Sequence, residues 1–368
     1  MAQSIISRNQ GILISQTDSS AILQAGFVQK TFHQVLSVYP NTFVAPTLDG
    51  YITKSVDSIV SVLSNATRDT KYPLDRLSSG NGLLRLWQKT GEDKYKTVVE
   101  ALRKSVDLQP RNNQGGLWYY VYPYWSYLDG MFSLTPFLAA YTDDVSNTSS
   151  TETVLEDVVL QLDLLWKHCY SEETGLLVHG YDASRTAVWA NNVTGASRHV
   201  WGRSLGWYCM ALIDTLELLP PAATQTRRYV EMRFQQLMPA VVAAADASTG
   251  AWWQVMDRPG QEGNYLESSA SSMFVYALLK GVRMGLLPTH AMSNGTVAVA
   301  KKAYGYIADT FVVHSGNGTL GWNGTVGVCS LNSTASYEYY VGRPIVYNSV
   351  LGSAAFVRAS LEVERLGI

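Results

Sequence analysis

The sequence predicts an all-α fold in which paired helices wind into a closed toroid and form a single domain over residues 1–368. Amphipathic helical patterns recur about once every 30 residues, whereas convincing β-alternation is short and local. No alternation of strands and helices indicates a parallel sheet, and no stretch rich in Pro, Gly or Ser divides the chain. With 46% hydrophobic residues in 368, the chain has enough apolar material for one large core.

Helical periodicity is clearest where apolar residues repeat on one face. In segment 151–169, Val154, Val158, Leu162 and Leu165 recur at i, i+4, i+8 and i+11, which is the spacing of a helical stripe. In chain order, the expected helices cover residues 20–38, 51–65, 78–90, 93–107, 126–141, 151–169, 203–219, 224–247, 267–286, 291–311 and 347–365.

Glycine and proline mark several helix ends. Gly91 follows the helix expected over 78–90, and Pro220-Pro221 ends another because proline lacks the amide donor that a helix needs. Two short segments, 176–181 and 251–256, have the composition of strands, and each could form one strand of a local hairpin.

Charge and hydropathy exclude several classes of partner. The net charge of −2 and the charged fraction of 16% leave no electrostatic footprint for nucleic acid or an anionic membrane surface. No apolar run reaches the roughly 18 residues of a membrane-spanning helix. We therefore expect no nucleic-acid or membrane partner, and we expect a monomer.

The chain carries N-x-[ST] sequons in a number that indicates an N-glycosylated, secreted protein. The sequons lie at Asn65, Asn147, Asn192, Asn294, Asn317, Asn323 and Asn332. Residues 1–11 lack the apolar stretch of a signal peptide, so the sequence would represent a mature form. A cytosolic protein rich in Asn-Gly-Thr loops is the alternative.

The three cysteines do not indicate a metal or redox site. Cys169, Cys209 and Cys329 form no C-x-x-C pair. Their number allows one disulfide with one thiol left over. Cys169 and Cys209 both lie in apolar helical patterns, which favours buried free thiols.

Two carboxylates are candidates for chemistry. Asp129 lies among aromatic residues at the start of an expected helix, so it either caps that helix or serves as an acid that holds a proton near neutral pH. Asp75 could likewise cap a helix, or pair with the adjacent Arg76. Two carboxylates are the minimum set of most glycosidases, but the sequence leaves open whether these two meet in space.

Aromatic and basic side chains suggest a sugar-binding wall. Trp201 and Trp207 could stack on sugar rings, and Arg203 between them could clamp a carboxylate. The alternative is a helix that packs both Trp side chains inward. Tyr124 and Trp125, in the aromatic stretch before Asp129, are further candidates for substrate binding.

His179 is the remaining polar candidate. It lies in the expected strand 176–181 and could position a sugar or relay a proton, or it could simply be a satisfied buried polar group. The sequence contains no G-x-S-x-G elbow, H-E-x-x-H motif, Walker loop or dinucleotide-binding glycine motif that would indicate another chemistry.

These clusters, in this order, resemble the unsaturated rhamnogalacturonyl hydrolases of glycoside hydrolase family 105, which are related to unsaturated glucuronyl hydrolases. The similarity extends from about residue 51 to residue 361. The matching segments are Leu74-Asp75, Thr90 to Tyr95, Gln109-Pro110-Arg111, Gly115 to Trp118, Tyr122-Pro123-Tyr124, Leu128 to Met131, Gly175-Leu176, His179 to Asp182, Trp189-Ala190, Trp201 to Trp207, Glu267 to Met273 and Tyr339-Tyr340.

The resemblance implies an (α/α)6 barrel and a hydrolase that removes a terminal 4,5-unsaturated uronic acid from pectin-derived oligosaccharides. Such an enzyme hydrates the C4=C5 double bond, and no metal or organic cofactor is implied. By the family pattern, Asp129 is the acid and base, and Asp75 orients the substrate or water and keeps Asp129 protonated by like-charge repulsion.

The same pattern implies that His179 and Arg203 contact the uronate and that Trp201 and Trp207 form the stacking walls. The chain departs from the family at Tyr119-Tyr120-Val121 and after Asn348, which leaves the linkage and the leaving sugar open.

Three alternatives remain at this point. The first is an unsaturated glucuronyl hydrolase that acts on other lyase-generated glycans. The second is a polysaccharide lyase or an inverting hydrolase on the same barrel. The third is a non-catalytic carbohydrate-binding toroid, which would have no use for Asp75 and Asp129 together.

Overall fold

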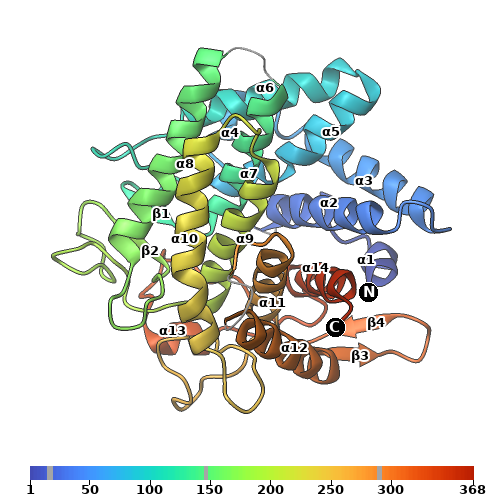
Figure 1. Ribbon diagram of the computed structural model, residues 1–368. Helices are drawn as coiled ribbons and strands as arrows, with labels where there is room; N and C mark the ends of the chain where they lie inside the picture. Colours follow the sequence, from blue (N-terminus) through green and yellow to red (C-terminus); the bar gives the residue numbers. More distant parts are fainter. Residues whose placement is uncertain (15–19, 145–147, 288–291) are drawn as a thin grey trace.

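A ring of six helical segments forms the inside of the protein (Figure 1). The structure is a computed structural model that describes residues 1–14, 20–144, 148–287 and 292–368. Each inner segment packs against the next, and the last packs against the first, so the ring is closed. In order, the ring contains α2 (Ala21–Val38), η1 with α5 (Leu74–Ser79 and Gly80–Thr90), α7 (Gly130–Asp144), α9 (Gly202–Leu218), α11 (Ser268–Arg283) and α14 (Val350–Leu366).

A second layer of helices covers the ring. Each outer helix packs on the inner segment that precedes it in the chain, while the short α1 packs on α14. The outer helices are α1 (Ala2–Ser7), α3 (Ala45–Val60), α6 (Asp93–Asp107), α8 (Thr148–Cys169), α10 (Thr224–Ala243) and α12 (Met292–Phe311). The predicted all-α fold and (α/α)6 barrel are therefore confirmed.

The remaining elements are short. A helical turn α4 (Ala66–Asp69) precedes η1, and α13 (Tyr337–Val341) precedes α14. Strand β1 (Trp125–Tyr127) pairs antiparallel with β2 (Gly180–Asp182), and β3 (Val312–His314) pairs antiparallel with β4 (Leu320–Trp322).

Three sequence predictions need correction. The helix expected over 126–141 begins only at Gly130, because the residues before it form strand β1. The strand expected over 176–181 is shifted to Gly180–Asp182, where it pairs with β1. Segment 251–256 is not a strand, because it forms only isolated bridges from Trp253 and Val255.

The helix expected over 51–65 is also misplaced. It runs over Ala45–Val60 and has Pro46 in its first turn, where proline's missing amide donor costs nothing. The C-terminal part of the predicted range, 61–65, lies outside this helix.

The inner helices are buried on nearly all sides because each contacts two inner neighbours and at least one outer helix. In α9, every residue from Gly202 to Leu216 is buried. A tight crossing joins α2 to η1 at Gly26, where an added Cβ would lie 2.3 Å from the carbonyl carbon of Ser78. Only glycine permits this approach, which fixes how the first inner helix meets the second.

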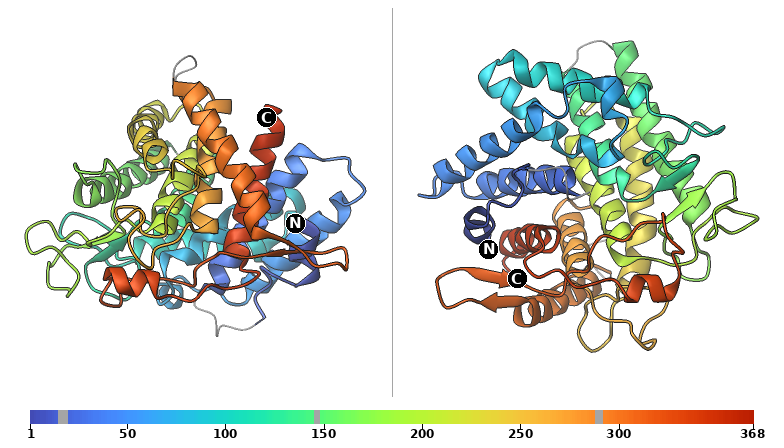
Figure 2. Two further views of the ribbon diagram at one scale, coloured as in Figure 1. Left: turned by 90° about the horizontal axis from the view of Figure 1, so that it is seen from below. Right: turned by 180° about the vertical axis from the view of Figure 1, so that it is seen from behind.

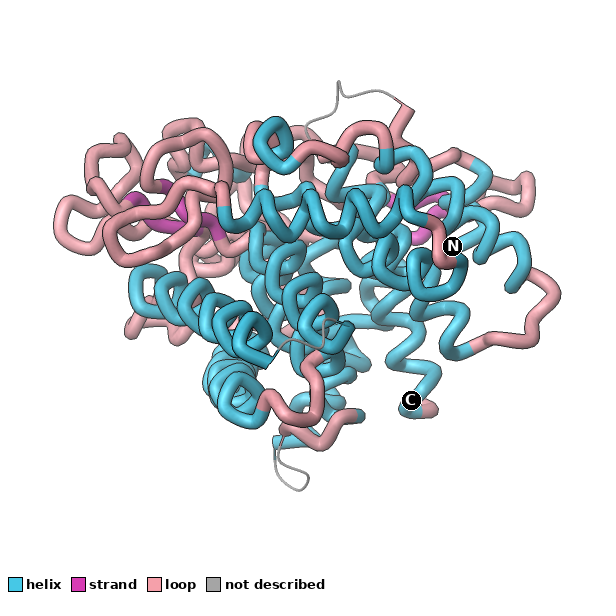
Figure 3. Tube along the Cα trace, turned by 90° about the horizontal axis from the view of Figure 1, so that it is seen from above, coloured by secondary structure: helices cyan, strands magenta, loops and turns pink. Residues whose placement is uncertain are grey.

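The long loops gather at the end of the barrel where the inner helices begin. Figure 2 shows β1, β2, α13 and the connecting loops at this end, and Figure 3 shows many of the loops, in pink, along one side of the helices. The inner helix N-termini therefore face a loop-rich surface, and residues just before or inside their first turns can meet there.

The structure also bears on the expectations for membrane spans and for the cysteines. Within the described residues, no helix is both long enough and apolar enough to cross a bilayer. Cys169, Cys209 and Cys329 are all buried free thiols, which confirms the expectation for the first two.

Candidate active site

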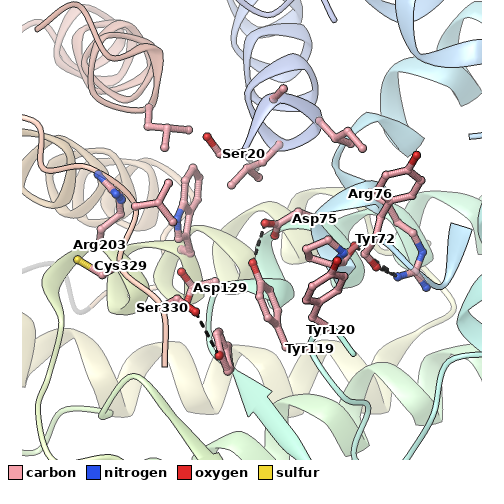
Figure 4. A pocket seen from close by; sticks show the side chains of 18 of the residues that line it. Ser20, Tyr72, Asp75, Arg76, Tyr119, Tyr120, Asp129, Arg203, Cys329 and Ser330 are labelled. Atoms are coloured by element: carbon pink, nitrogen blue, oxygen red, sulfur yellow. Dashed lines mark hydrogen bonds between the residues drawn. The ribbon is translucent and has the colours of Figure 1, made fainter. Parts of the chain in front are cut away.

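A cavity of about 400 Å³ opens at the end of the barrel where the inner helices begin (Figure 4). Its size is within the range of small-molecule sites. Its lining comes from the first turn of α2, from η1, from the loop around β1, from the start of α9 and from the loop before α13. The polar and aromatic lining residues are Ser20, Tyr72, Asp75, Arg76, Tyr119, Tyr120, Tyr122, Tyr127, Asp129, Trp201, Arg203, Trp207, Cys329 and Ser330.

Asp75 lies in the first turn of η1 and is 6% exposed. Its Oδ2 accepts a 2.7 Å hydrogen bond from the phenol of Tyr119, and its Oδ1 has no hydrogen-bond partner among the described residues. Burial raises the pKa of Asp75 to about 7, the hydrogen bond from Tyr119 opposes this shift, and the charge of Asp129 adds to it. Asp75 therefore carries a proton much of the time near neutral pH.

The two simpler roles considered for Asp75 do not apply. Its neighbour Arg76 turns away and donates to Ser105 and Gln109. Within the described residues, no ion pair joins Asp75 to Arg76, and the carboxylate makes no capping bond to its own helix.

Asp129 lies between β1 and α7, and its side chain is 11% exposed. Its Oδ2 accepts a 2.5 Å hydrogen bond from Ser204 in the first turn of α9. The Nε2 atom of His179 lies 3.2 Å from the same oxygen, without the alignment of a hydrogen bond. On the other side of the ring, His179 Nδ1 lies 2.8 Å from the phenol oxygen of Tyr340.

Local backbone contacts hold the two carboxyls at one site. The amide of Leu74 donates to the carbonyl of Tyr119, which joins η1 to the aromatic loop, and the amide of Leu128 donates to the carbonyl of His179. Gly130 opens α7, and a Cβ there would lie 2.9 Å from Leu74 Cδ1. This close approach places Asp129 beside the turn that carries Asp75, so the structure brings together the two carboxyls whose meeting the sequence left open.

Arg203 and the two Trp residues around it line the cavity, but each is also tied to the protein. The Arg203 guanidinium donates to the carbonyls of Val326 and Gly327 at 2.6 and 2.7 Å. It also lies over the ring of Trp201, 4.9 Å from its centroid. Trp207 packs against aromatic residues of α2 and α7 and is 1% exposed. These side chains thus serve as cavity wall and as core.

Tyr124 and Trp125 do not line the cavity. Trp125 packs edge-on against Trp189, with ring centroids 5.2 Å apart. Tyr124 is 40% exposed, has a φ of 68° and packs edge-on against Trp118. The structure therefore gives these two predicted substrate-binding residues positions beside the site instead of within it.

Several residues of the site were not predicted. Tyr119, Tyr120, Tyr122 and Tyr127 belong to the aromatic stretch before Asp129, and their density was the signal that could have identified them. Ser204 lies within the segment Trp201 to Trp207, which is one of the segments that carry the family resemblance. By contrast, the lining residues Leu13, Ser20 to Leu23 and Val328 to Ser330 carry no motif.

The position of the cavity gives it an electrostatic preference. Inner helices α2, α7, α9 and α14 begin beside it, so the positive ends of their dipoles and their free amide groups face its lining. This arrangement favours a ligand with a negative charge. Among the described residues, no three His, Cys, Asp or Glu side chains are grouped so that they could hold a metal ion.

Comparisons with known proteins agree with this architecture. The model of Glycosyl Hydrolase Family 88 matches residues 29–367. A family 105 glycoside hydrolase from C. acetobutylicum is 32% identical and superposes with a TM-score of 0.84, covering 99% of this chain and 98% of that one. A 24.9 kDa protein from the picA locus of Rhizobium radiobacter is 31% identical over 225 residues, which are 60% of this chain and 94% of that protein.

A more distant structure shares the fold. The unsaturated glucuronyl hydrolase of Bacillus sp. GL1, responsible for glycosaminoglycan degradation, is 14% identical with a TM-score of 0.65, over 99% of this chain and 97% of that one. The family model and the C. acetobutylicum structure together show that the chain is a glycoside hydrolase and belongs to the related families 88 and 105.

Proposed function

We propose that this enzyme removes a 4,5-unsaturated uronic acid from the non-reducing end of rhamnogalacturonan oligosaccharides by hydrating the C4=C5 double bond. The observation that carries the proposal is a pair of buried, electrostatically coupled carboxyls, Asp75 and Asp129, in an aromatic cavity of sugar size. A binding protein without catalysis would gain nothing from placing two carboxyls together in a dry site.

In the proposed reaction, Asp129 donates a proton to C4, and positive charge develops at C5, shared with the ring oxygen. Water adds to C5 as the Asp129 carboxylate takes up one of its protons, which restores the acid. The resulting hemiketal opens to a ketone at C5. The hemiacetal left at C1 then collapses to an aldehyde and releases the leaving sugar with its hydroxyl restored.

Ser204 and His179 support this role of Asp129. The Ser204 hydroxyl donates to Oδ2 and His179 Nε2 lies next to it, so both can stabilise the carboxylate that remains after proton transfer. Because Oδ2 is engaged by these groups, Oδ1 is the oxygen that faces the substrate in the proposed reaction.

Asp75 has a different role in the proposed reaction. Near neutral pH it is largely protonated, because burial raises its pKa to about 7. In its neutral form, its unpartnered Oδ1 can donate a hydrogen bond to a sugar hydroxyl. The neutral form also avoids a second negative charge beside the anionic uronate.

Two observations favour an anionic substrate in spite of the two carboxyls. The starts of four inner helices face the cavity, and the guanidinium of Arg203 is part of its wall. The positive ends of these helices can therefore attract the uronate carboxylate, while the Arg203 guanidinium is held by the carbonyls of Val326 and Gly327 and lies 4.0 Å from the carboxylate of Glu267.

An unsaturated glucuronyl hydrolase is the second candidate, and it is favoured by the shared fold of the Bacillus enzyme. Elimination at C4 removes the configuration that distinguishes galacturonate from glucuronate. The anomeric linkage and the leaving sugar are therefore what separate the two candidates.

The test follows the ultraviolet absorbance of the double bond. With rhamnogalacturonan oligosaccharides produced by a lyase, the absorbance should fall and free rhamnose-ended product should appear. A polysaccharide lyase would instead raise the absorbance of the intact polymer. Activity only on unsaturated glycosaminoglycan fragments would assign the second candidate.

The variant Asp129→Asn tests the proton donor, because it keeps the shape of the side chain and removes the acid. We expect kcat/KM to fall about 100-fold to 10,000-fold, as for loss of a general acid. The exposed Asp107→Asn, on α6, is the control for removing one acidic charge. Full activity of Asp129→Asn would refute the assignment.

We also propose that the protein is secreted and N-glycosylated. Asn65, Asn192, Asn317, Asn323 and Asn332 are exposed, as glycan attachment requires, while Asn147 and the side chain of Asn294 lie outside the described residues. Mass spectrometry of protein from a secreting eukaryotic host, before and after treatment with peptide N-glycosidase, tests this. An unchanged mass would contradict it.

A further inference from the structure

We propose that the barrel interior contains a second binding site, for a small oxyanion such as phosphate, behind the aromatic wall of the substrate cavity. The site is formed by three cationic side chains, Lys30, Arg85 and Arg358, which come from the inner segments α2, α5 and α14. This inference does not depend on which sugar the enzyme releases.

A layer of aromatic side chains lies between the substrate cavity and these cations. The rings of Phe27, Phe132 and Trp207 contact one another, with centroids 4.6 to 5.4 Å apart. Trp207 lines the substrate cavity, whereas the ammonium of Lys30 lies over the ring of Phe132, 4.2 Å from its centroid. Lys30 does not line the cavity, so the cations lie behind its wall and not within it.

A proline in α7 explains where the Lys30 ammonium is held. Pro136 lies inside this helix and has no amide donor, so the carbonyl of Phe132, four residues earlier, lacks its helical partner. Lys30 Nζ donates to this carbonyl at 3.0 Å. Among the described residues, this is the only hydrogen bond of the ammonium, and no carboxylate forms an ion pair with it. Two of its three N–H donors therefore remain for a ligand.

The two guanidinium groups also have free donors. Arg358 is 4% exposed, and it donates from Nε to Gln34 and from Nη2 to Asp214 and Tyr276. Its Nη1 has no hydrogen-bond partner among the described residues, although the side chain is buried. Arg85 is exposed and forms no hydrogen bond or ion pair within the part of the chain that the structure describes. A buried donor without a partner is unfavourable, and an anion would supply the partner.

The charges around the site are not balanced. The carboxylates beside the cations are Asp214 and Glu217, which both pair with Lys280, and Asp214 also pairs with Arg358. Together with the two cations that have no carboxylate partner, four cationic side chains face these two carboxylates. Glu362, further along α14, is already matched by two arginines of its own. The cluster therefore lacks negative charge, which is costly in a buried position.

The cations lie close enough to affect one another. Burial lowers the pKa of Lys30 to about 7, and the charge of Asp214 opposes this shift. The charges of Arg358, Arg85 and Lys280 lower the same pKa further. Burial also lowers the pKa of Arg85, and the charge of Arg358 adds to that effect. An anion bound among these side chains would favour the charged form of each.

The surroundings of the site allow a small ion to enter from solvent. Arg85 is exposed and the side chain of Glu217 is 50% exposed, so the cluster reaches the surface beside the later turns of the inner helices. Two guanidinium groups and an ammonium suit an oxyanion, because guanidinium donors bind pairs of oxygen atoms. The negative ends of the inner-helix dipoles offset part of the positive charge, so they are the alternative to a bound ion.

The test is titration calorimetry of the whole protein with inorganic phosphate near neutral pH, at an ionic strength held constant with sodium chloride. We expect saturable binding with a Kd of about 1 mM or lower. A general effect of phosphate on the solvent would give no saturable heat. If the helix ends alone neutralise the cations, phosphate will not bind, and that result overturns the proposal.

Two variants remove one cation each. Arg85→Gln should weaken phosphate binding at least about tenfold, and it should fold normally because Arg85 is exposed and has no partner to lose among the described residues. Lys30→Met should weaken binding to a similar extent. Arg228→Gln is the matched control, since Arg228 is exposed on the outer helix α10, and it should leave the Kd unchanged.

The variants also distinguish this site from the substrate cavity, which attracts anions as well. Phosphate bound in the substrate cavity would compete with the unsaturated oligosaccharide, and its binding would survive both Arg85→Gln and Lys30→Met. Phosphate bound behind the aromatic layer should leave KM unchanged. Binding that persists in either variant, or an equal loss in Arg228→Gln, overturns the site as described, whatever the enzyme's activity on the sugar substrates.

Discussion

Replacing Asp75 with Asn should make the protein more stable at alkaline pH while it impairs catalysis. Asp75 is 6% exposed, and one of its carboxyl oxygens has no partner among the described residues. Burial raises its pKa from 3.8 to about 7, and the charge of Asp129 acts in the same direction. Above that pH, the folded protein contains an ionised carboxylate in a site with little water.

The magnitude follows from the change in pKa between the unfolded and folded chain. Each pH unit corresponds to about 1.4 kcal/mol, so a carboxyl whose pKa rises from 3.8 to about 7 accounts for about 4 kcal/mol. The folded pKa is the higher one. The contribution of Asp75 to stability is therefore fully present below about pH 4 and is lost as the pH rises through about 7.

The variant Asp75→Asn lacks this titration but can still accept the hydrogen bond from Tyr119. Its free energy of unfolding relative to the unmodified protein should increase by up to about 1.4 kcal/mol per pH unit between about pH 4 and pH 7, and level off above. The unpaired amide group of Asn offsets part of the gain. We expect a net stabilisation of about 2–4 kcal/mol near pH 8.

The assay is urea unfolding of both proteins at a series of pH values from about 5 to about 8, with Asp107→Asn as the exposed control. A difference between Asp75→Asn and the unmodified protein that stays constant over this range would refute the reasoning. A gain in stability together with a loss of activity is the behaviour of a group retained for function.

Other substitutions test the site and the packing around it. Ser204→Ala removes the 2.5 Å hydrogen bond to Asp129 and should lower kcat/KM about tenfold to hundredfold, with an unchanged circular dichroism spectrum. Gly26→Ala inserts a Cβ 2.3 Å from the backbone of η1 and should destabilise the fold by about 1–3 kcal/mol or more in the same urea assay. Gly50→Ala lies in helix α3, where the added Cβ meets nothing within 4 Å, and should stabilise the fold by about 0.5–1 kcal/mol. Asp214→Asn leaves the buried Arg358 without its ion-pair partner and leaves Lys280 with Glu217 alone, and it should cost about 3–5 kcal/mol in that assay.

Much of the helical architecture could be predicted because each helix carries its own periodic pattern. The helix expected over 93–107 has those bounds in the structure. The failures occur where tertiary contacts outweigh local pattern. Residues 126 and 127 continue a helical pattern in the sequence, yet they belong to β1 because pairing with Gly180–Asp182 satisfies their backbone groups.

The misplaced start of α3 has a different cause. The sequence pattern predicts a helix that begins at residue 51, although Pro46 lies next to the observed start at Ala45. Proline in a first helical turn is a start signal that the sequence offered. The boundary was therefore readable from local chemistry, unlike the strand pairing.

The site was predictable to the extent that its residues lie near the starts of inner helices. Asp75, Asp129 and Arg203 are far apart in the chain but all lie at the same end of the ring. The direction in which an individual side chain points could not be predicted from the sequence. Tyr124 and Trp125 stand in the same aromatic stretch as Tyr122, yet only Tyr122 lines the cavity.

The position of the site also explains how two carboxyls and an anionic sugar can share one cavity. Two ionised carboxylates beside a uronate would repel it, and burial of their side chains weakens the screening of their charges. Burial lessens this conflict by keeping a proton on Asp75 near neutral pH. The starts of four inner helices supply positive potential, whereas the charge of Arg203 is offset by the buried carboxylate of Glu267 at 4.0 Å. The closed ring brings Asp75 on η1 together with these helix starts, because the inner segments begin at the same end of the barrel.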